Sequence, residues 1–338
     1  MTAPGTLLPY HVRHDATRDL DGPAAAPAPC HAPRRKAAIH AAFVALALMA
    51  AGPGGAIAAS PGTINAVGVE NEYADVISQI GGTYVQVSAI ETDPNTDPHS
   101  FEASPKVATQ IASASLIVKN GIGYDSWADK IIAAAPNADR KVIDVQQLLN
   151  LPDSTPNPHL WYDPKTMPAV AKAVADALSA LEPAEAAYFE ANAKAFDASL
   201  EPWFAAIASF KASYGGTPVA VTEPVADYLL EAMGCNIATP FSFQAAIMNG
   251  TDPSPQDVTT QNNLLSQGQV KVLVYNQQVT DPLTQSLLSL AKKNGIPVVG
   301  VYETMPAPGY NYQSWMLAEV ASLQKAVADK VSTETLLK

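Results

Sequence analysis

Two histidine loops of similar sequence are the residues of this chain best suited to chemistry. His99 lies in residues 97–102 (DPHSFE) and His159 in residues 157–161 (NPHLW), while the other four histidines all precede residue 59. A neutral imidazole is the commonest protein ligand for a transition metal. Two isolated Pro-His loops therefore indicate a metal site assembled from distant parts of the chain.

Two glutamates, Glu223 and Glu303, each come directly after a strand-like run in the second half of the chain. In parallel α/β sheets, ligands bind outside the carboxyl ends of the strands, and both histidine loops also follow strand-like runs. Together with His99 and His159, the two carboxylates form a four-donor set for Zn²⁺, Mn²⁺ or Fe²⁺.

Each of these four residues also has an ordinary structural explanation. His99 could be a solvated loop residue, and His159 a packed imidazole bonded to a nearby carbonyl. Glu223 precedes Pro224, so it could be an exposed acid at a helix start, where a carboxylate complements the helix dipole. Glu303 lies beside a proline-rich loop that looks flexible. To dismiss the metal site, all four of these explanations must hold together.

The elements that must position these side chains are short apolar runs alternating with helical patterns. Several runs lack polar–apolar alternation, as strands buried on both faces do. Helices between such strands indicate parallel sheets of the α/β class. The predicted strands are residues 64–69, 84–90, 115–118, 141–145, 218–222, 236–240, 270–275 and 297–302.

The predicted strands fall into two groups of four, which indicates two lobes, at residues 60–165 and 211–338. Residues 166–210 between them read as a stiff helical connector without glycine. The predicted inner faces of its two helices are Val170, Val174, Leu178 and Leu181, then Phe189, Ala193, Phe196 and Leu200. A last helix after Trp315 would bury Met316, Val320, Leu323, Val327 and Val331.

Residues 1–59 read as a leader that contains a secretory signal peptide. Three basic residues at 34–36 precede an apolar run at 37–51, which is followed by a small-x-small site ending at Ala58. A membrane anchor is the alternative, but the apolar run of about 15 residues is shorter than the roughly 20 needed to span a bilayer. Cleavage near Ala58 would place the mature protein in the periplasm or outside the cell.

Charge and composition exclude several function classes. The formal net charge is −12, and the residues beyond 59 carry 15 basic and 29 acidic side chains, a net charge of −14. Such a chain repels phosphate backbones, so we expect no nucleic acid partner. Cys235 is the only cysteine after the leader, which excludes a thiolate metal site. Arg140 is the only arginine there, which argues against binding of an anionic iron chelate.

Besides the two Pro-His loops, several short sequence motifs occur in a characteristic order and spacing between Ile64 and Val331. Here the chain resembles the periplasmic metal-binding proteins of manganese/zinc ABC importers, the substrate-binding group often called cluster nine. Besides both Pro-His loops, the resemblance rests on residues 119–127 (KNGIGYDSW), 188–192 (YFEAN), 274–277 (VYNQ), 303–306 (ETMP) and 312–316 (YQSWM).

The resemblance implies two α/β lobes, each a small parallel sheet flanked by helices, joined by a long rigid helix with the metal in the cleft. His99, His159 and Glu223 fall on the family's first three ligand positions. The fourth is usually aspartate but here matches Glu303, whose longer side chain must sit back or bind through one oxygen. Zinc members often carry a His-rich loop and a third histidine, which this chain lacks. Its harder donor set favours Mn²⁺ narrowly over Zn²⁺.

We therefore expect a monomeric solute-binding protein that captures a divalent metal outside the cytoplasm and delivers it to an ABC permease. The residues expected to support the histidine rings are Asn120, Trp161 and Asp163. The alternative is a metal-dependent zinc hydrolase that uses the same His₂Glu site, with Glu303 as general base. The sequence contains no His-Glu-x-x-His, Gly-x-Ser-x-Gly or phosphate-loop motif, so we do not expect an enzyme.

Overall fold

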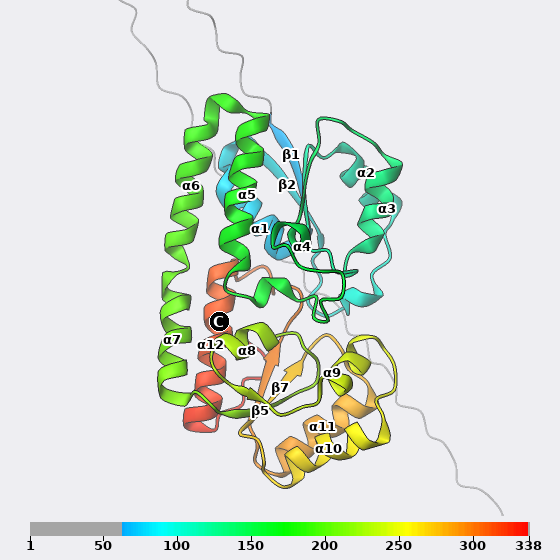
Figure 1. The fold of residues 1–338 in the computed structure, drawn as a ribbon, viewed down its shortest axis with the longest axis vertical. Helices are drawn as coiled ribbons and strands as arrows, with labels where there is room; N and C mark the ends of the chain where they lie inside the picture. The colour runs from blue at the N-terminus through cyan, green and yellow to red at the C-terminus, as the bar shows by residue number, and fades with distance from the viewer. Residues whose placement is uncertain (1–62, 337–338) are drawn as a thin grey trace, which may run out of the picture. The chain divides into compact units, whose positions relative to one another are not determined.

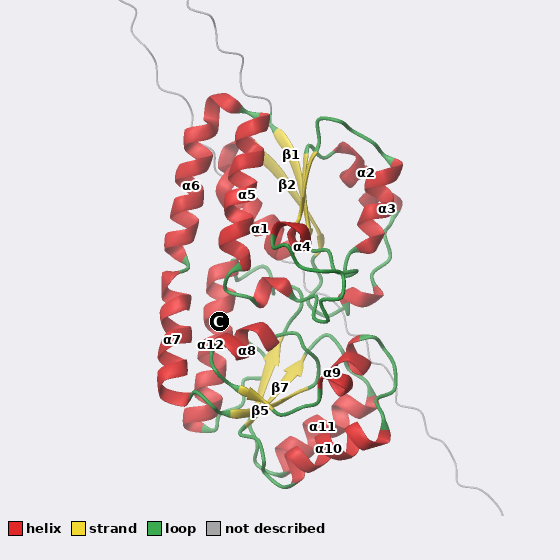
Figure 2. Ribbon diagram, in the orientation of Figure 1, coloured by secondary structure: helices red, strands yellow, loops and turns green. Residues whose placement is uncertain are grey.

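The computed structural model describes residues 63–336. The predicted leader and its cleavage position near Ala58 lie outside the described residues. Two four-stranded sheets, both wholly parallel, form the framework, as the sequence predicts (Figure 1, Figure 2). We call the first sheet with its helices the first lobe and the second sheet with its helices the second lobe.

The first lobe has the strand order β2-β1-β3-β4. Its strands are β1 (Ile64–Glu70), β2 (Val85–Glu91), β3 (Leu116–Lys119) and β4 (Lys141–Asp144). Its helices are α1 (Asn71–Gly81), α2 (Pro105–Ser113), α3 (Ser126–Ala134) and α4 (Val145–Leu148).

The second lobe repeats this arrangement with the order β6-β5-β7-β8. Its strands are β5 (Pro218–Val221), β6 (Asn236–Ile237), β7 (Val272–Asn276) and β8 (Val298–Val301). Its helices are α8 (Asp227–Ala232), α9 (Phe241–Met248), α10 (Pro255–Ser266) and α11 (Pro282–Lys293).

Burial explains why the strands read as unbroken apolar runs. All residues of the inner strands β3 and β7 are buried, and so are those of β8 at the edge of the second sheet, whereas the edge strand β4 is partly exposed. In each sheet the order in which successive strands are added reverses at one point. This switch point lies between β1 and β3 in the first sheet and between β5 and β7 in the second. Such switch points leave a crevice at the carboxyl ends of the strands, and the loops that carry the candidate donors leave from those ends.

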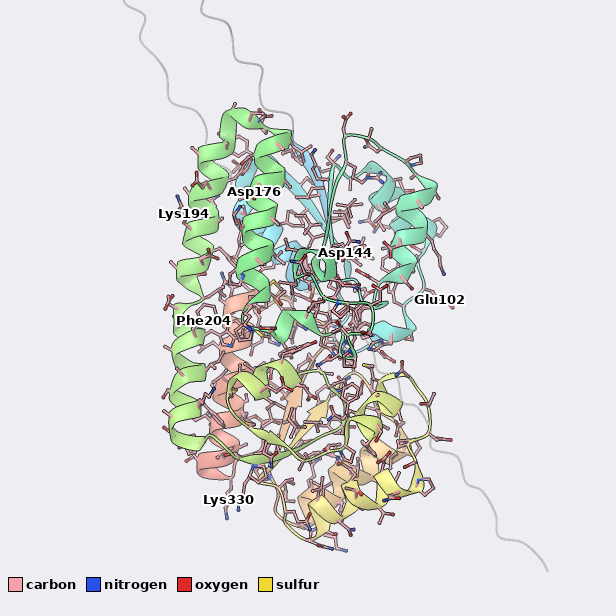
Figure 3. The ribbon with its side chains drawn as sticks, in the orientation of Figure 1. Glu102, Asp144, Asp176, Lys194, Phe204 and Lys330 are labelled. Carbon is pink, nitrogen blue, oxygen red and sulfur yellow. The ribbon has the colours of Figure 1, made fainter. Side chains whose placement is uncertain are left out.

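Helices α5 (Thr166–Leu181), α6 (Ala186–Ser199) and α7 (Glu201–Tyr214) connect the lobes. α6 and α7 run end to end (Figure 1), and the break between them falls at Leu200, just before Pro202. The predicted inner faces are buried except at Leu181, which is half-buried. The outer faces are solvated: Asp176 on α5 and Lys194 on α6 project outward (Figure 3).

The last helix, α12 (Tyr312–Asp329), packs against α7, β8 and α1. Its Met316, Val320 and Leu323 are buried as predicted. The prediction that Val331 shares this face is wrong. The helix ends at Asp329 because Lys330 adopts a left-handed conformation (φ 57°), and Val331 is 47% exposed.

Within residues 63–336, no helix combines the length and the apolar character needed to cross a membrane.

One carboxyl group of α12 makes the stability of the fold depend on pH. Glu319 is buried, and its Oε1 accepts hydrogen bonds from Trp315 Nε1 (3.0 Å) and Tyr162 Oη (3.3 Å). Burial raises the pKa of Glu319 from an ordinary value near 4.5 to about 8. The folded chain therefore keeps a proton that the unfolded chain releases above about pH 4.5, so the contribution of Glu319 to stability falls as pH rises toward 8.

We predict that Glu319→Gln removes this part of the pH dependence. At pH 8 the variant should gain stability relative to the unaltered chain, by an amount on the order of a few kcal/mol, and the gain should shrink by pH 5. Urea unfolding of both chains at the two pH values measures the difference. Glu201→Gln, at an exposed position on α7, is the control. Equal pH slopes for Glu319→Gln and the unaltered chain would contradict the assignment.

Candidate metal centre

Three of the four predicted donors converge on one point between the lobes. The donor atoms of His99, His159 and Glu303 all lie within 4.8 Å of one another, and within residues 63–336 no other set of three such side chains does so. Glu303 Oε2 is 3.3 Å from His99 Nε2 and 3.1 Å from His159 Nε2. Two rings from the first lobe thus face one carboxylate oxygen from the second.

These distances match the edges of a metal coordination shell. In a tetrahedral site with bonds of about 2.0–2.1 Å, neighbouring donors are about 3.3–3.4 Å apart. The two measured separations, 3.1 and 3.3 Å, differ from that spacing by at most a few tenths of an ångström. The donor set therefore requires little rearrangement to accept a transition metal ion.

The side chain of Asn157 fixes the orientation of the His159 ring. Its Nδ2 donates to the carbonyl of Pro224 (2.7 Å), so its Oδ1 faces the ring and lies 2.7 Å from His159 Nδ1. An amide oxygen only accepts hydrogen bonds, and Nδ1 must therefore carry the proton. In the neutral ring, this leaves the lone pair of Nε2 free to bind a metal.

A neutral His159 places two hydrogen-bond acceptors, its Nε2 and Glu303 Oε2, 3.1 Å apart. Such a contact requires either a proton or a cation between the two atoms. Complete burial lowers the pKa of His159 and disfavours the protonated ring. The arrangement is therefore better suited to holding a metal ion than to holding an imidazolium.

His99 is held by its loop and is the more accessible of the two rings. Asp97 caps the turn Pro98–Ser100 by accepting a hydrogen bond from the backbone N–H of His99 (2.8 Å). The His99 side chain is 21% exposed, whereas that of His159 is fully buried. Burial lowers the pKa of His99, but its hydrogen bond with Glu303 and the charge of that carboxylate outweigh burial and raise it.

Glu303 uses its two oxygens differently. Oε2 faces both rings and also accepts a hydrogen bond from Tyr124 Oη (3.1 Å), while Oε1 accepts one from Asn276 Nδ2 (2.8 Å). Burial tends to raise the pKa of Glu303, yet the hydrogen bonds and charges of the two histidines hold it well below its usual range. The carboxylate therefore presents one oxygen to the rings, which is one of the two arrangements expected for the longer side chain.

Glu223 lies beside this cluster rather than in it. Its Oε1 accepts a hydrogen bond from Asn276 Nδ2 (3.1 Å), the same nitrogen that contacts Glu303. Its Oε2 is buried and has no hydrogen-bond partner among the described residues. Glu223 is 3% exposed and α8 begins only at Asp227, so it is not an exposed acid at a helix start. The unpartnered oxygen leaves a donor available at the edge of the site.

Acidic side chains crowd around the donor set, and their proximity opposes their ionisation. Burial, followed by the charge of Glu303, raises the pKa of Glu223 and of Asp97. Burial also raises the pKa of Glu72 to about 8, with a further contribution from Glu303. Bound divalent cations relieve such crowding of carboxylates, because the ion is the largest local charge in a site.

The three residues expected to support the rings have different roles. Asn120 donates to the carbonyl of Pro158 (2.8 Å), and so positions the His159 loop rather than its ring. Trp161 packs edge-on against the ring of His159, with centroids 5.4 Å apart. Asp163 accepts a hydrogen bond from the backbone N–H of Lys165 (3.0 Å). The ring partner is instead Asn157.

Sequence reasoning missed Asn157, Tyr124 and Asn276 as residues of the site. All three stand in strings that carry the family resemblance, so a signal for them was present. Their roles depend on which loops meet in space. Asn276, for example, contacts carboxylates that lie 53 and 27 residues away in the chain.

Comparison with known proteins identifies the family of this chain. Residues 70–326 match the sequence profile of the family described as the periplasmic component A of zinc-uptake complexes, and the chain belongs to this family of metal ABC transporter substrate-binding proteins.

Among curated relatives, the metal ABC transporter substrate-binding lipoprotein FimA of Streptococcus parasanguinis is 26% identical, with 78% of this chain and 88% of FimA covered. The manganese ABC transporter substrate-binding lipoprotein PsaA of Streptococcus pneumoniae is 23% identical over the same shares. Two chlamydial relatives, from Chlamydia trachomatis and Chlamydia muridarum, are 27% and 30% identical, but the match spans only 59% and 44% of their lengths.

Solved structures share the fold. A crystal structure of ZnuA superposes with a TM-score of 0.63 at 22% identity, covering 79% of this chain and all of that one. FpvC from Pseudomonas aeruginosa, in complex with Mn²⁺, gives a TM-score of 0.66 at 20% identity, with 79% and 99% covered. At this level of identity the likeness establishes the two-lobed fold.

We predict that Asn157→Ala weakens metal binding without unfolding the chain. Loss of the Nδ1 partner frees the His159 ring to rotate and to change tautomer, which should lower metal affinity about ten- to hundredfold. Titration with Zn²⁺ under chelator competition measures the change. Asn192→Ala is the matched control, because Asn192 on α6 also donates to a backbone carbonyl, that of Ile80 (2.9 Å), which belongs to none of the loops that carry the donors. Equal affinities in both variants would contradict the role of Asn157.

Proposed function

We propose that this protein captures a divalent transition metal between its lobes and delivers it to the membrane permease of an ABC importer. The observation that carries the proposal is the contact of one carboxylate oxygen of Glu303 with Nε2 of both His99 and His159. These donors come from both lobes, so a bound ion would join the lobes and separating them would release it. A carrier needs that property.

The proposed ligands are His99, His159, Glu303 and Glu223. The first three already share a common centre. Glu223 completes the set by turning its unpartnered Oε2 toward that centre, with Asn276 keeping hold of Oε1. Two imidazoles and two carboxylates saturate a four-coordinate ion and leave no open position for a reacting water, as suits binding rather than catalysis.

Manganese is the proposed cargo, by a narrow margin over zinc. Two carboxylates make a harder donor set than three imidazoles, and harder sets suit Mn²⁺. PsaA is named for manganese, and FpvC was solved with Mn²⁺, while the family profile is described by zinc uptake. Zn²⁺ binds most nitrogen and oxygen sites more tightly than Mn²⁺ does, so competition between the two ions is the decisive measurement.

The alternative of a zinc hydrolase requires Glu303 to act as a base on a metal-bound water. Glu303 instead faces both ring nitrogens directly, which supports its role as a ligand in this proposal. Family membership also favours the binding protein. Delivery to a permease, action as a monomer, and residence in the periplasm or outside the cell complete the proposal. The names of FimA and PsaA as ABC transporter substrate-binding lipoproteins support the transport role.

We predict that the metal-free chain binds about one Mn²⁺ or Zn²⁺ per molecule and gains thermal stability by mass action. Separate titrations that follow the melting temperature and bound metal test this, and a competition titration ranks the ions. Binding of neither ion would overturn the proposed function.

The ligand assignment has its own test. His99→Ala, His159→Ala and Glu303→Gln should each lower metal affinity by more than about a hundredfold, because each removes a direct donor. Glu223→Gln should have a smaller effect if Glu223 must move to bind. Glu102→Gln is the control; Glu102 is exposed at the last position of the His99 loop and is labelled in Figure 3. Retained affinity in either histidine variant would refute the site.

A further inference from the structure

The backbone that carries Glu303 is gripped by two side-chain amides, one from each lobe. Three successive backbone N–H groups, those of Glu303, Thr304 and Met305, all donate to side-chain amide oxygens. Loops are usually among the most mobile parts of a fold. Residues 303–305 are instead fixed one by one, because each backbone N–H donates to a specific side-chain amide.

Gln278, which follows β7 in the second lobe, provides the first grip. Its Oε1 accepts the N–H groups of Glu303 (2.6 Å) and Thr304 (2.9 Å). Its Nε2 donates to Thr304 Oγ1 (3.1 Å) and, across the cleft, to the backbone carbonyl of Thr96 (2.7 Å). Thr96 lies three residues before His99, so one amide connects the Glu303 loop to the His99 loop.

Asn71, at the start of α1 in the first lobe, provides the second grip. Its Oδ1 accepts the N–H of Met305 (3.0 Å), and its Nδ2 donates to the carbonyl of the same residue (2.8 Å). This paired contact crosses from the first lobe to the loop two residues beyond Glu303. The segment 303–305 is thus held from both sides of the cleft.

Because both amides are buried, losing their hydrogen bonds costs free energy. Gln278 and Asn71 are each 6% exposed, so water cannot easily replace a partner that is lost. A buried amide left unsatisfied is costly, which ties the formation of these hydrogen bonds to closure of the cleft. Opening the lobes would break the Gln278–Thr96 and Asn71–Met305 contacts together with the contacts of the metal site.

We propose that Gln278 and Asn71 are positioning residues that clamp the Glu303 loop between the lobes and set the rate at which the metal leaves. The inference rests on the proposed function, since it concerns release from the same site. Neither side chain contacts the donor atoms of His99, His159 or Glu303. Each acts on the Glu303 carboxylate through the backbone of residues 303–305, and Gln278 also acts on His99 through Thr96.

The rates of metal binding and release distinguish a residue that clamps the closed state from a residue that only supports the fold. If the clamp holds the closed state, its loss should raise the dissociation rate of the metal and leave the association rate nearly unchanged, because the donor side chains are intact. We expect dissociation to accelerate roughly ten- to hundredfold in Gln278→Ala, and by a smaller factor in Asn71→Ala.

The experiment uses the purified chain loaded with Zn²⁺ and, separately, with Mn²⁺. Excess EDTA starts dissociation, and tryptophan fluorescence follows it, since Trp161 packs against the ring of His159. Gln313→Ala is the matched control. Gln313 also makes an amide–amide contact between α12 and the first lobe, with Gln79 (2.7 Å), but this contact does not involve the metal loops.

The outcomes separate the clamp from the proposed function. Faster dissociation in both clamp variants, with the control unchanged, supports the clamp. Unchanged dissociation in a Gln278→Ala chain that still binds metal overturns the clamp alone, and Asn71→Ala gives the same test from the other lobe if Gln278→Ala does not fold. Failure of the unaltered chain to bind either ion overturns the proposed function and the clamp with it.

Discussion

The structure depends on a contact that would be unfavourable without a cation or a proton: a buried carboxylate oxygen against two imidazole nitrogens. Glu303 Oε2 meets Nε2 of His99 and His159 at 3.3 and 3.1 Å. Asn157 keeps the proton of His159 on Nδ1, so the nitrogen facing Glu303 is an acceptor. At His159, burial lowers the pKa and so disfavours the imidazolium that would otherwise resolve the conflict at that ring. A positive charge between Glu303 and the two rings would therefore stabilise this contact.

Polar side chains around the site hold its donors by hydrogen bonds that cross the cleft. Asn157 joins His159 to the backbone of Pro224, next to Glu223. Gln278 joins the Glu303 loop to the backbone that precedes His99. Side-chain amides are well suited to positioning the donor residues, because each amide is uncharged and offers both a hydrogen-bond donor and an acceptor. They can thus position carboxylates and imidazoles without competing with them for the metal.

Much of the fold was predictable because its determinants are local. All eight predicted strands are present, since buried parallel strands read as short apolar runs. The helical faces of the connector were also predictable from their period, down to Phe189 and Phe196. The prediction failed at Val331, where one left-handed residue ends a helix whose apolar pattern continues. A change of backbone conformation at one position leaves the apolar periodicity unaltered.

The sequence by itself determined which side chains could bind a metal: two Pro-His loops and two glutamates at strand ends, in a chain with few histidines and one cysteine beyond its leader. Tertiary structure alone decided how they meet. It brought Glu303 against both rings, left Glu223 one amide away, and chose Asn157 rather than Asp163 to orient a ring. The physical reason is that donor type is a property of a residue, whereas distance and orientation depend on loops from two lobes whose contacts span more than a hundred residues of chain.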